Sequence, residues 1–308
     1  MSTYLVTGGC GFIGSHLADA LVARGDRVRI LDDLSTGRPE NAPAEAEVTV
    51  GDVADTGVVA KAMAGVDGCF HLAAVASVQR GNEDWVGTHR TNVGGAVTVF
   101  DAARRARADE PVPVVYASSA AVYGDNPAVP LPETAAPAPL SAYGADKLGC
   151  EWHGRVARRV HGVPTVGLRF FNVYGPRQDP DSPYSGVIAI FAARLGRGEG
   201  IEIFGDGGQV RDFVYVADVV RHLVAAMDRR PAEPEIYNVC TGRATSVREL
   251  AETIADLCGV GADIAYRPPR PGDVRRSIGD PTKAAAAFGF AADTTLTEGL
   301  RPTLAAAD

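Results

Sequence analysis

A cluster of glycines near the start of the chain places the strongest limit on its fold. An apolar strand pattern at residues 4–6 leads into a turn, and a helical pattern follows over 13–24. The turn reads Gly8-Gly9-Cys10-Gly11-Phe12-Ile13-Gly14. Glycine permits a tight turn and a close approach of the backbone to a pyrophosphate, and the N–H groups that begin a helix attract an anion. This order of strand, turn and helix predicts the first unit of a dinucleotide-binding fold.

Short apolar runs alternate with helical patterns throughout the first half of the chain. The strand patterns lie at 4–6, 28–31, 48–50, 69–70, 112–116 and 163–168. The clearest helical patterns lie at 13–24, 55–64, 87–107 and 142–160. Nearly continuous apolar strands that alternate with helices are typical of a parallel sheet covered on both faces. We therefore predict an α/β fold built on a Rossmann-type, doubly wound parallel sheet.

The alternation weakens after about residue 170, where prolines and glycines interrupt the chain. The clearest later elements are a helix at 217–227, a strand at 236–239 and a helix at 246–257. The proline-rich segments 125–139 and 268–272 read as loops, and 284–308 reads as a short helix with a frayed end. We predict a dinucleotide-binding domain over 1–168, to which later elements return, and a smaller mixed α/β substrate domain over 169–308.

Composition and charge exclude several classes of function. The chain has 308 residues and a net charge of −8, which disfavours a nucleic-acid-binding surface. No apolar run approaches the roughly 20 residues of a membrane span, and the chain begins with a strand pattern rather than a signal peptide. The five cysteines are scattered without metal-ligand spacing. We expect a cytoplasmic protein with reduced cysteines, no metal site and no membrane partner.

The residues after successive strands predict the identity of the dinucleotide. Asp32 ends the second strand pattern, 18 residues after Gly14, where an acid accepts hydrogen bonds from ribose hydroxyls and repels a 2′-phosphate. NAD is therefore favoured over NADP, although Arg38 keeps NADP open. The third strand pattern is followed by residues placed to reach adenine, and the fourth by residues placed along the cofactor. The residues after the third strand are Asp52 and Val53, and those after the fourth are Leu72, Ala73 and Ala74. The small apolar residues among them fit plain packing in the sheet equally well.

A tyrosine and a lysine four residues apart predict proton transfer beside that cofactor. Tyr143 and Lys147 lie on one face if residues 142–160 are helical, so the ammonium can lie near the phenol. A free tyrosine has a pKa of roughly 10, and a nearby cation favours the phenolate. Ser119, 24 residues earlier, supplies a hydroxyl that can hold a substrate oxygen. A lone pair with this spacing is usually structural, but the glycine turn upstream favours a proton relay beside a hydride acceptor.

With these features in order, the chain resembles the extended short-chain dehydrogenase/reductase family. Within that family it is most similar to nucleotide-sugar 4-epimerases of the UDP-glucose 4-epimerase type. The resemblance covers essentially the whole chain. It is carried by residues 7–14, 32–37, 71–74, 118–124, 143–147, 169–177, 204–207 and 211–213.

The resemblance implies a role for each of a set of residues. Tyr143 is implied as the base and acid at the sugar 4-hydroxyl, with Lys147 lowering its pKa and binding the nicotinamide ribose and Ser119 bonding the 4-oxygen. Further contacts to NAD are implied for Gly8, Gly11, Phe12, Ile13, Gly14, Leu34, Ser35, Thr36, Gly37, Asn92 and Phe170. The nucleoside diphosphate is expected to contact Asn172, Arg211, Arg270 and Asp273, in a pocket lined by Val187, Phe204, Phe213 and Val247.

The residues after Ser119 bear on which reaction follows oxidation at C4 of the sugar. Dehydratases and decarboxylases of the family carry an acid there, whereas this chain has Ala120 and Ala121. Alanine cannot move a proton. Epimerisation needs no further acid, so the sequence favours an NAD-dependent 4-epimerase that interconverts UDP-glucose and UDP-galactose. A dehydratase, a decarboxylase, a ketoreductase that consumes free cofactor and a non-catalytic dinucleotide sensor remain as alternatives.

The hexose and the oligomeric state are expected from resemblance alone. Ser277 stands where the family sets the width of the pocket near the sugar 2-substituent, and a small serine suggests that UDP-N-acetylhexosamines are also accepted. Arg275 and Arg276 keep a UDP-glucuronate 4-epimerase open. The helices at 87–107 and 142–160 are expected to pair across a two-fold axis, which would make the protein a homodimer.

Overall fold

The chain forms two compact units, each of which takes segments from different parts of the sequence. The computed structural model describes residues 1–107, 110–179, 186–229, 233–269 and 274–306. Unit 1 comprises Met1–Val122, Ser141–Arg169 and Val220–Tyr237. Unit 2 comprises Tyr123–Leu140, Phe170–Val219 and Asn238–Asp308. The expected domains 1–168 and 169–308 stay a prediction, although the chain does pass between units at Arg169 and Phe170.

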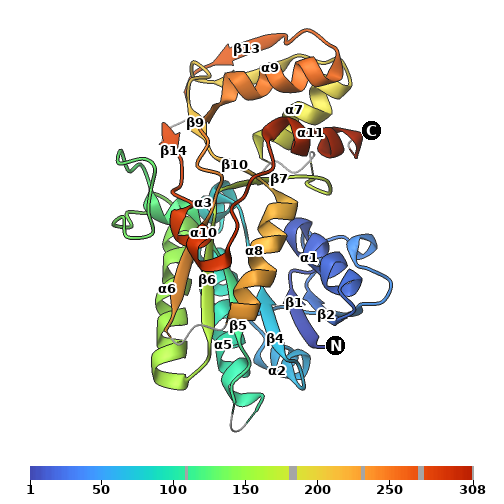
Figure 1. The fold of residues 1–308 in the computed structure, drawn as a ribbon, viewed down its shortest axis with the longest axis vertical. Coiled ribbons are helices and arrows are strands. Elements are labelled where there is room, and N and C mark those ends of the chain that lie inside the picture. Colours follow the sequence, from blue (N-terminus) through green and yellow to red (C-terminus); the bar gives the residue numbers. More distant parts are fainter. Residues whose placement is uncertain (108–109, 180–185, 230–232, 270–273, 307–308) are drawn as a thin grey trace. The chain divides into compact units, whose positions relative to one another are not determined.

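A seven-stranded sheet forms the centre of the Rossmann-type fold, in the order β11-β6-β5-β4-β1-β2-β3 (Figure 1). The strands are β1 (Thr3–Thr7), β2 (Arg27–Asp32), β3 (Glu47–Val50), β4 (Gly68–His71), β5 (Val114–Ser119), β6 (Thr165–Phe170) and β11 (Glu235–Val239). The pairs β1–β2, β1–β4, β2–β3 and β4–β5 are parallel. The strand order reverses beside β1, and ligands of such sheets bind outside the carboxyl ends of the strands at this point. The predicted fold class is confirmed.

Helices cover the sheet of unit 1. They are α1 (Phe12–Ala23), α2 (Thr56–Met63), α3 (Val78–Glu83), α4 (Trp85–His89), α5 (Gly95–Arg105), α6 (Ala142–His161) and α8 (Val216–Arg229), which begins in unit 2. Buried residues of α2, α5 and α6 share one apolar core with β1, β2, β4 and β5. In that core the rings of Phe100 and Tyr116 meet edge to face, with centroids 5.5 Å apart.

The single helix predicted over 87–107 is wrong in one respect. Residues Arg90–Gly94 form a π-helical turn between α4 and α5. Asn92 lies in that turn, and its amide is bonded to the backbone of Val75 in both directions, at 2.8 Å and 3.3 Å. Single π-helical turns inside α-helices are frequent at functional sites. The sequence did not reveal this turn, because its glycines and its asparagine leave the apolar periodicity of the helix uninterrupted.

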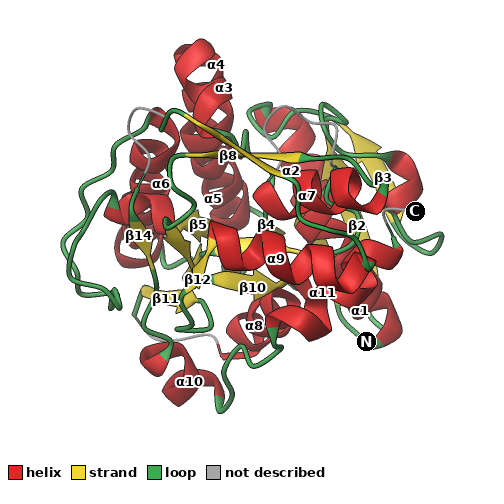
Figure 2. Ribbon diagram, turned by 90° about the horizontal axis from the view of Figure 1, so that it is seen from above, coloured by secondary structure: helices red, strands yellow, loops and turns green. Residues whose placement is uncertain are grey.

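Unit 2 is a mixed α/β arrangement of short strands and helices (Figure 2). Three small sheets have the orders β10-β7, β12-β9-β14 and β13-β8. Their strands are β7 (Asn172–Tyr174), β8 (Ile201–Phe204), β9 (Val210–Arg211), β10 (Phe213–Tyr215), β12 (Thr245–Ser246), β13 (Ile264–Arg267) and β14 (Arg276–Ser277). The helices are α7 (Val187–Gly196), α9 (Val247–Cys258), α10 (Thr282–Phe288) and α11 (Leu296–Ala305), and buried side chains of α7, α9 and α11 share a core.

The end of the chain differs from the prediction of one short helix and a frayed tail. It forms two helices, α10 and α11. The second begins with a capping box, in which Thr295 accepts from the N–H of Glu298 while the Glu298 side chain accepts from the N–H of Thr295. The Thr-x-x-Glu spacing was the available signal for the start of this helix, whereas Pro302 inside it favours a break.

Candidate functional site

The glycine turn of unit 1 leaves no room for a side chain at Gly8 or at Gly14. Gly8 has a φ of +70°, and a Cβ atom there would lie 2.8 Å from the backbone nitrogen of Ala73. A Cβ atom on Gly14 would collide with the carbonyl of Gly8. The helix α1 follows, capped at Gly11 without a side-chain hydrogen bond. The first N–H groups of α1, at Phe12, Ile13 and Gly14, are therefore oriented to receive an anion, which fits the predicted pyrophosphate.

Asp32 connects the glycine turn to the segment that follows β2. Its carboxylate accepts from the N–H of Cys10 and from the N–H of Leu34, both at 2.9 Å. The side chain is buried, and burial raises the pKa of Asp32. A Cβ atom on Gly37 would lie 2.7 Å from the same carboxylate. Each carboxylate oxygen has a second lone pair, so Asp32 can accept a ribose hydroxyl while it holds the turn. Ser35 and Thr36, between Leu34 and Gly37, are exposed.

The residues predicted to lie along the cofactor occupy two different surroundings. Leu72, Ala73 and Ala74 are half-buried after β4, and Ala73 lies beside the glycine turn. Asn92 fixes this segment through Val75, as described above. Asp52 accepts from the N–H of Ala54 at 2.8 Å and forms an ion pair with Arg90 at 2.8 Å. Val53 packs in the apolar core, so its side chain has a structural role that the sequence left open.

The three residues of the predicted relay lie at the carboxyl end of β5 and the start of α6. Ser119 is the last residue of β5, and its Oγ accepts from the N–H of Ala121 at 3.1 Å. Lys147 is 5% exposed, and its Nζ donates to the carbonyl of Ala117 at 3.0 Å. The same Nζ lies 5.9 Å from the ring centroid of Tyr143. Tyr143 and Lys147 therefore share a helix face, and the ammonium is fixed beside the phenol.

His71 is a buried residue of this site to which the sequence gave no role. Its Nδ1 lies 2.8 Å from Thr7 Oγ1, and that oxygen accepts from the N–H of Ala73 at 3.3 Å. The Thr7 hydroxyl proton is thus available to His71. Burial, aided by the charge of Lys147, lowers the pKa of His71 to about 3. His71 is therefore neutral at physiological pH, and it links the end of β4 to the end of β1, directly before the glycine turn.

In unit 2, Arg211 is the centre of a small group of predicted substrate residues. β9 lies between β12 and β14, so Arg211 is paired with Thr245 on one side and Ser277 on the other. Its Nη1 donates to the carbonyl of Val274 at 2.7 Å. On the neighbouring pair of strands, Asn172 is exposed and paired with the buried Phe213.

A buried carboxylate that the sequence analysis missed holds this group together. Asp212 accepts from the N–H and Oγ1 of Thr241 at 2.8 Å and 2.7 Å, from the N–H of Gly242 at 2.9 Å and from that of Gly279 at 3.3 Å. Its own backbone is bonded to Ser277 and Asn172. Burial raises the pKa of Asp212, and the four donors oppose that shift. The sequence did contain a signal for this residue, since Asp212 is an acid that stands between an arginine and an apolar strand.

The other predicted nucleotide residues are spread over several elements. Val187 and Val247 begin α7 and α9, and Phe204 ends β8. Phe170, predicted to contact the cofactor, ends β6 and is 8% exposed. Arg270 and Asp273 lie outside the residues that the structure describes.

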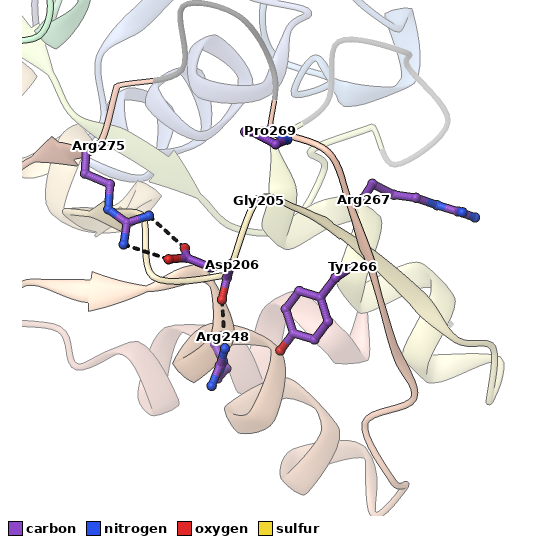
Figure 3. A pocket seen from close by; sticks show the side chains of 7 residues that line it. All are labelled: Gly205, Asp206, Arg248, Tyr266, Arg267, Pro269 and Arg275. Atoms are coloured by element: carbon purple, nitrogen blue, oxygen red, sulfur yellow. Dashed lines mark hydrogen bonds and ion pairs between the residues drawn. The ribbon is translucent and has the colours of Figure 1, made fainter.

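A cavity of about 620 Å³ follows the end of β8 (Figure 3). It is lined by Gly205, Asp206, Arg248, Tyr266, Arg267, Pro269 and Arg275. Arg275 forms two bonds to the Asp206 carboxylate, at 2.7 Å and 3.0 Å, and holds the pKa of Asp206 well below its usual range. The Arg248 guanidinium lies 5.6 Å from the Tyr266 ring centroid. Arg248 and Arg275 thus both bond to Asp206, in the loop that joins Phe204 to β9.

The described residues contain neither a candidate metal-binding cluster nor a candidate membrane-spanning helix. Among residues 1–107, 110–179, 186–229, 233–269 and 274–306, no group of three His, Cys, Asp or Glu side chains is arranged to hold a metal ion. Within the same ranges, no helix has the length and apolar character needed to cross a membrane.

Comparison with known proteins gives close relatives over nearly the whole chain. Residues 4–240 match the model of the NAD dependent epimerase/dehydratase family. A UDP-glucose 4-epimerase of Mycolicibacterium smegmatis is 41% identical over 310 residues, which cover 97% of this chain and 96% of that protein.

Two solved structures are similar throughout. The UDP-glucose 4-epimerase of Thermotoga maritima with UDP-glucose has a TM-score of 0.93 and 38% identity, and covers 99% of this chain and 98% of its own. The UDP-N-acetylglucosamine 4-epimerase of Methanobrevibacter ruminantium in complex with UDP-N-acetylmuramic acid has a TM-score of 0.93 and 34% identity, with 99% and 97% covered.

The buried His71 predicts a measurable loss of stability in acid. The unfolded chain takes up a proton at this residue below about pH 6.5, whereas the folded chain does not until about pH 3. The free energy of unfolding therefore falls as pH falls from about 6.5 to about 3, and the contribution of His71 approaches about 1.4 kcal/mol per pH unit. Above this window His71 contributes no pH dependence. Urea unfolding between pH 7 and pH 4 should show a shallower decline for His71→Gln than for the wild type. His153→Gln, an exposed histidine on α6, is the control, and equal slopes for all three proteins would contradict the prediction.

Proposed function

Because the chain belongs to the NAD dependent epimerase/dehydratase family, we propose that it is a nucleotide-sugar 4-epimerase that interconverts UDP-glucose and UDP-galactose. The strongest support lies at the end of β5. There a buried, immobilised Lys147 lies beside Tyr143, and the two positions after Ser119 are alanine. This set of groups can move one proton at the sugar 4-oxygen and offers no second acid from those two positions for elimination or decarboxylation.

The proposed mechanism divides the work between the relay and the cofactor. The glycine turn and Asp32 would hold NAD, which when bound would supply hydride-transfer chemistry. Tyr143, with the Lys147 ammonium beside its ring, removes the proton of the 4-hydroxyl. Ser119 holds the 4-oxygen. After the 4-keto sugar has turned its other face, Tyr143 returns the proton, so the residues end each cycle in their starting state.

The remaining alternatives differ in how well the residues support them. A UDP-glucuronate 4-epimerase would use a cation to receive the sugar carboxylate, but the Arg275 guanidinium is already bonded to Asp206 through both Nη atoms. A ketoreductase would release its cofactor after each turnover, whereas an epimerase regenerates NAD in place. NAD that stays with the protein through desalting would therefore favour the epimerase.

Removal of one hydroxyl tests the proposed function. Tyr143→Phe should lower the conversion of UDP-galactose to UDP-glucose by about 100-fold or more, because the base is lost. The NAD content after desalting should stay unchanged. Tyr4→Phe, a buried tyrosine of β1 in the same unit, is the control and should retain wild-type turnover. Full activity of Tyr143→Phe would refute the assignment of the base.

The width of the sugar pocket gives a second test. We propose that the wild type also epimerises the UDP-N-acetylhexosamine pair, because the residue beside Arg211 in β14 is a small serine. Ser277→Tyr should reduce kcat/KM for UDP-N-acetylgalactosamine by about tenfold or more while UDP-galactose is retained. Thr245→Tyr places the same side chain on the opposite neighbour of Arg211 and serves as the control. Turnover of the unacetylated pair alone, with no effect of Ser277→Tyr, would contradict this expectation.

An exposed apolar stripe on α6 supports a homodimer. Trp152, Val156 and Val160 follow one another at intervals of four residues, with exposures of 55%, 47% and 69%. Val97 on α5 is also exposed, at 38%. Side chains at this spacing share one helix face, and an apolar face of this kind is typical of a helix that packs against a partner. We propose that a second copy of the chain covers it.

A charge in the middle of the stripe tests the homodimer. Val156→Glu should shift the mass measured by light scattering from two chains to one, because a carboxylate would be buried without a partner. Val50→Glu makes the same change at an exposed valine of β3, away from the stripe, and should leave the mass at two chains. A wild type that is monomeric at all concentrations would disprove the dimer.

A further inference from the structure

An ion pair almost without solvent access joins α6 to β6. Arg169 donates from Nε to Glu151 Oε1 at 2.8 Å and from Nη2 to Oε2 at 2.7 Å. Ser118 Oγ donates to the same Oε1 at 2.5 Å. The side chains of Arg169 and Glu151 are each 6% exposed. One carboxylate on α6 is therefore held by donors from two adjacent strands.

Stability alone gives a weak account of this arrangement. The desolvation of two charges is expensive, and a buried ion pair can often be replaced by well-packed apolar residues with no loss of stability. The helix α6 already shares an apolar core with β5, so it needs no such pair to stay on the sheet. What the pair adds is a fixed distance and direction between the elements, because a bidentate arginine bond tolerates little displacement.

The pair fixes the elements that carry the proposed relay. Glu151 lies one helical turn after Lys147, and both side chains bond to β5, at Ser118 and at the carbonyl of Ala117. The next residue of the strand is Ser119. Arg169 in turn precedes Phe170, at the end of β6. The lysine has a flexible stem, and its Nζ is bonded to the Ala117 carbonyl of β5, so the position of its ammonium depends on how α6 and β5 are held.

We propose that Glu151, together with Arg169 and Ser118, is a positioning residue for the relay of Ser119, Tyr143 and Lys147. This inference rests on the proposed function. Loss of the carboxylate would let α6 move along β5, and the Lys147 ammonium would leave its place beside Tyr143. A displacement of about 1 Å at a reacting group can cost about 100-fold in rate. Nucleotide binding, assigned to residues of unit 2, should be unaffected.

A double replacement separates positioning from stability. Glu151→Leu with Arg169→Met exchanges the pair for apolar side chains of similar length. The melting temperature and NAD content should stay close to wild type, kcat for UDP-galactose should fall about tenfold or more, and KM should be unchanged. Glu233→Leu with Arg159→Met is the matched control, because it makes the same change to an exposed ion pair between a residue of α6, Arg159, and Glu233, which precedes β11. That control should retain wild-type kcat.

A second variant keeps the inference testable if the double variant does not fold. Ser118→Ala removes one donor to Glu151 and should lower kcat several-fold at unchanged melting temperature, and Ser118→Thr, which restores the hydroxyl, should recover it. The inference is overturned if folded, NAD-loaded variants keep kcat within about twofold of wild type. It is also overturned if their activity falls only in step with melting temperature. An inactive wild type would instead refute the proposed function, and this inference with it.

Discussion

The hydrogen bond from Lys147 Nζ to the carbonyl of Ala117 is the contact on which the candidate active site depends. An ammonium that is 5% exposed needs a partner, and a backbone carbonyl at a strand end is a rigid one. That bond fixes the charge 5.9 Å from the Tyr143 ring centroid. It also acts on His71, whose pKa is lowered by burial and by the charge of Lys147, so His71 stays neutral near the ammonium.

In unit 2 a buried charged side chain bonded to the backbone again positions the polar residues, but here the charge is negative. Asp212 is a fully buried carboxylate, and the N–H and hydroxyl donors of Thr241, Gly242 and Gly279 surround it. These donors come from segments far apart in sequence, so the carboxylate gathers the short strands around Arg211. Strands of two or three residues have few ladder bonds of their own, and a buried charge with backbone partners supplies the missing rigidity.

The sequence was a good guide to what depends on local pattern. Alternating strands and helices, the glycine turn and the shared face of Tyr143 and Lys147 all follow from periodicity or from spacing within a few residues. The partners that fix the site do not: Ala117 and Lys147 are 30 residues apart, and Arg211 and Val274 are 63 apart. Such pairs depend on which distant segments the fold brings together, and the hydrophobic periodicity of a single segment does not specify that. The π-helical turn around Asn92 escaped for the same reason, since its cause is a contact with Val75.

The turn after β5 bears on why this framework would stop at epimerisation. Ala120 and Ala121 begin a short helical turn, and the N–H of Ala121 donates to Ser119 Oγ. A hydroxyl that accepts one bond from the backbone keeps its own proton to donate, so Ser119 can hold a sugar oxygen without exchanging a proton with a side chain of its own turn. The residues that follow thus contribute only a backbone donor. In the proposed reaction every proton then passes through Tyr143, and a reaction with one proton-transfer residue returns the sugar oxygen to a hydroxyl on one face or the other.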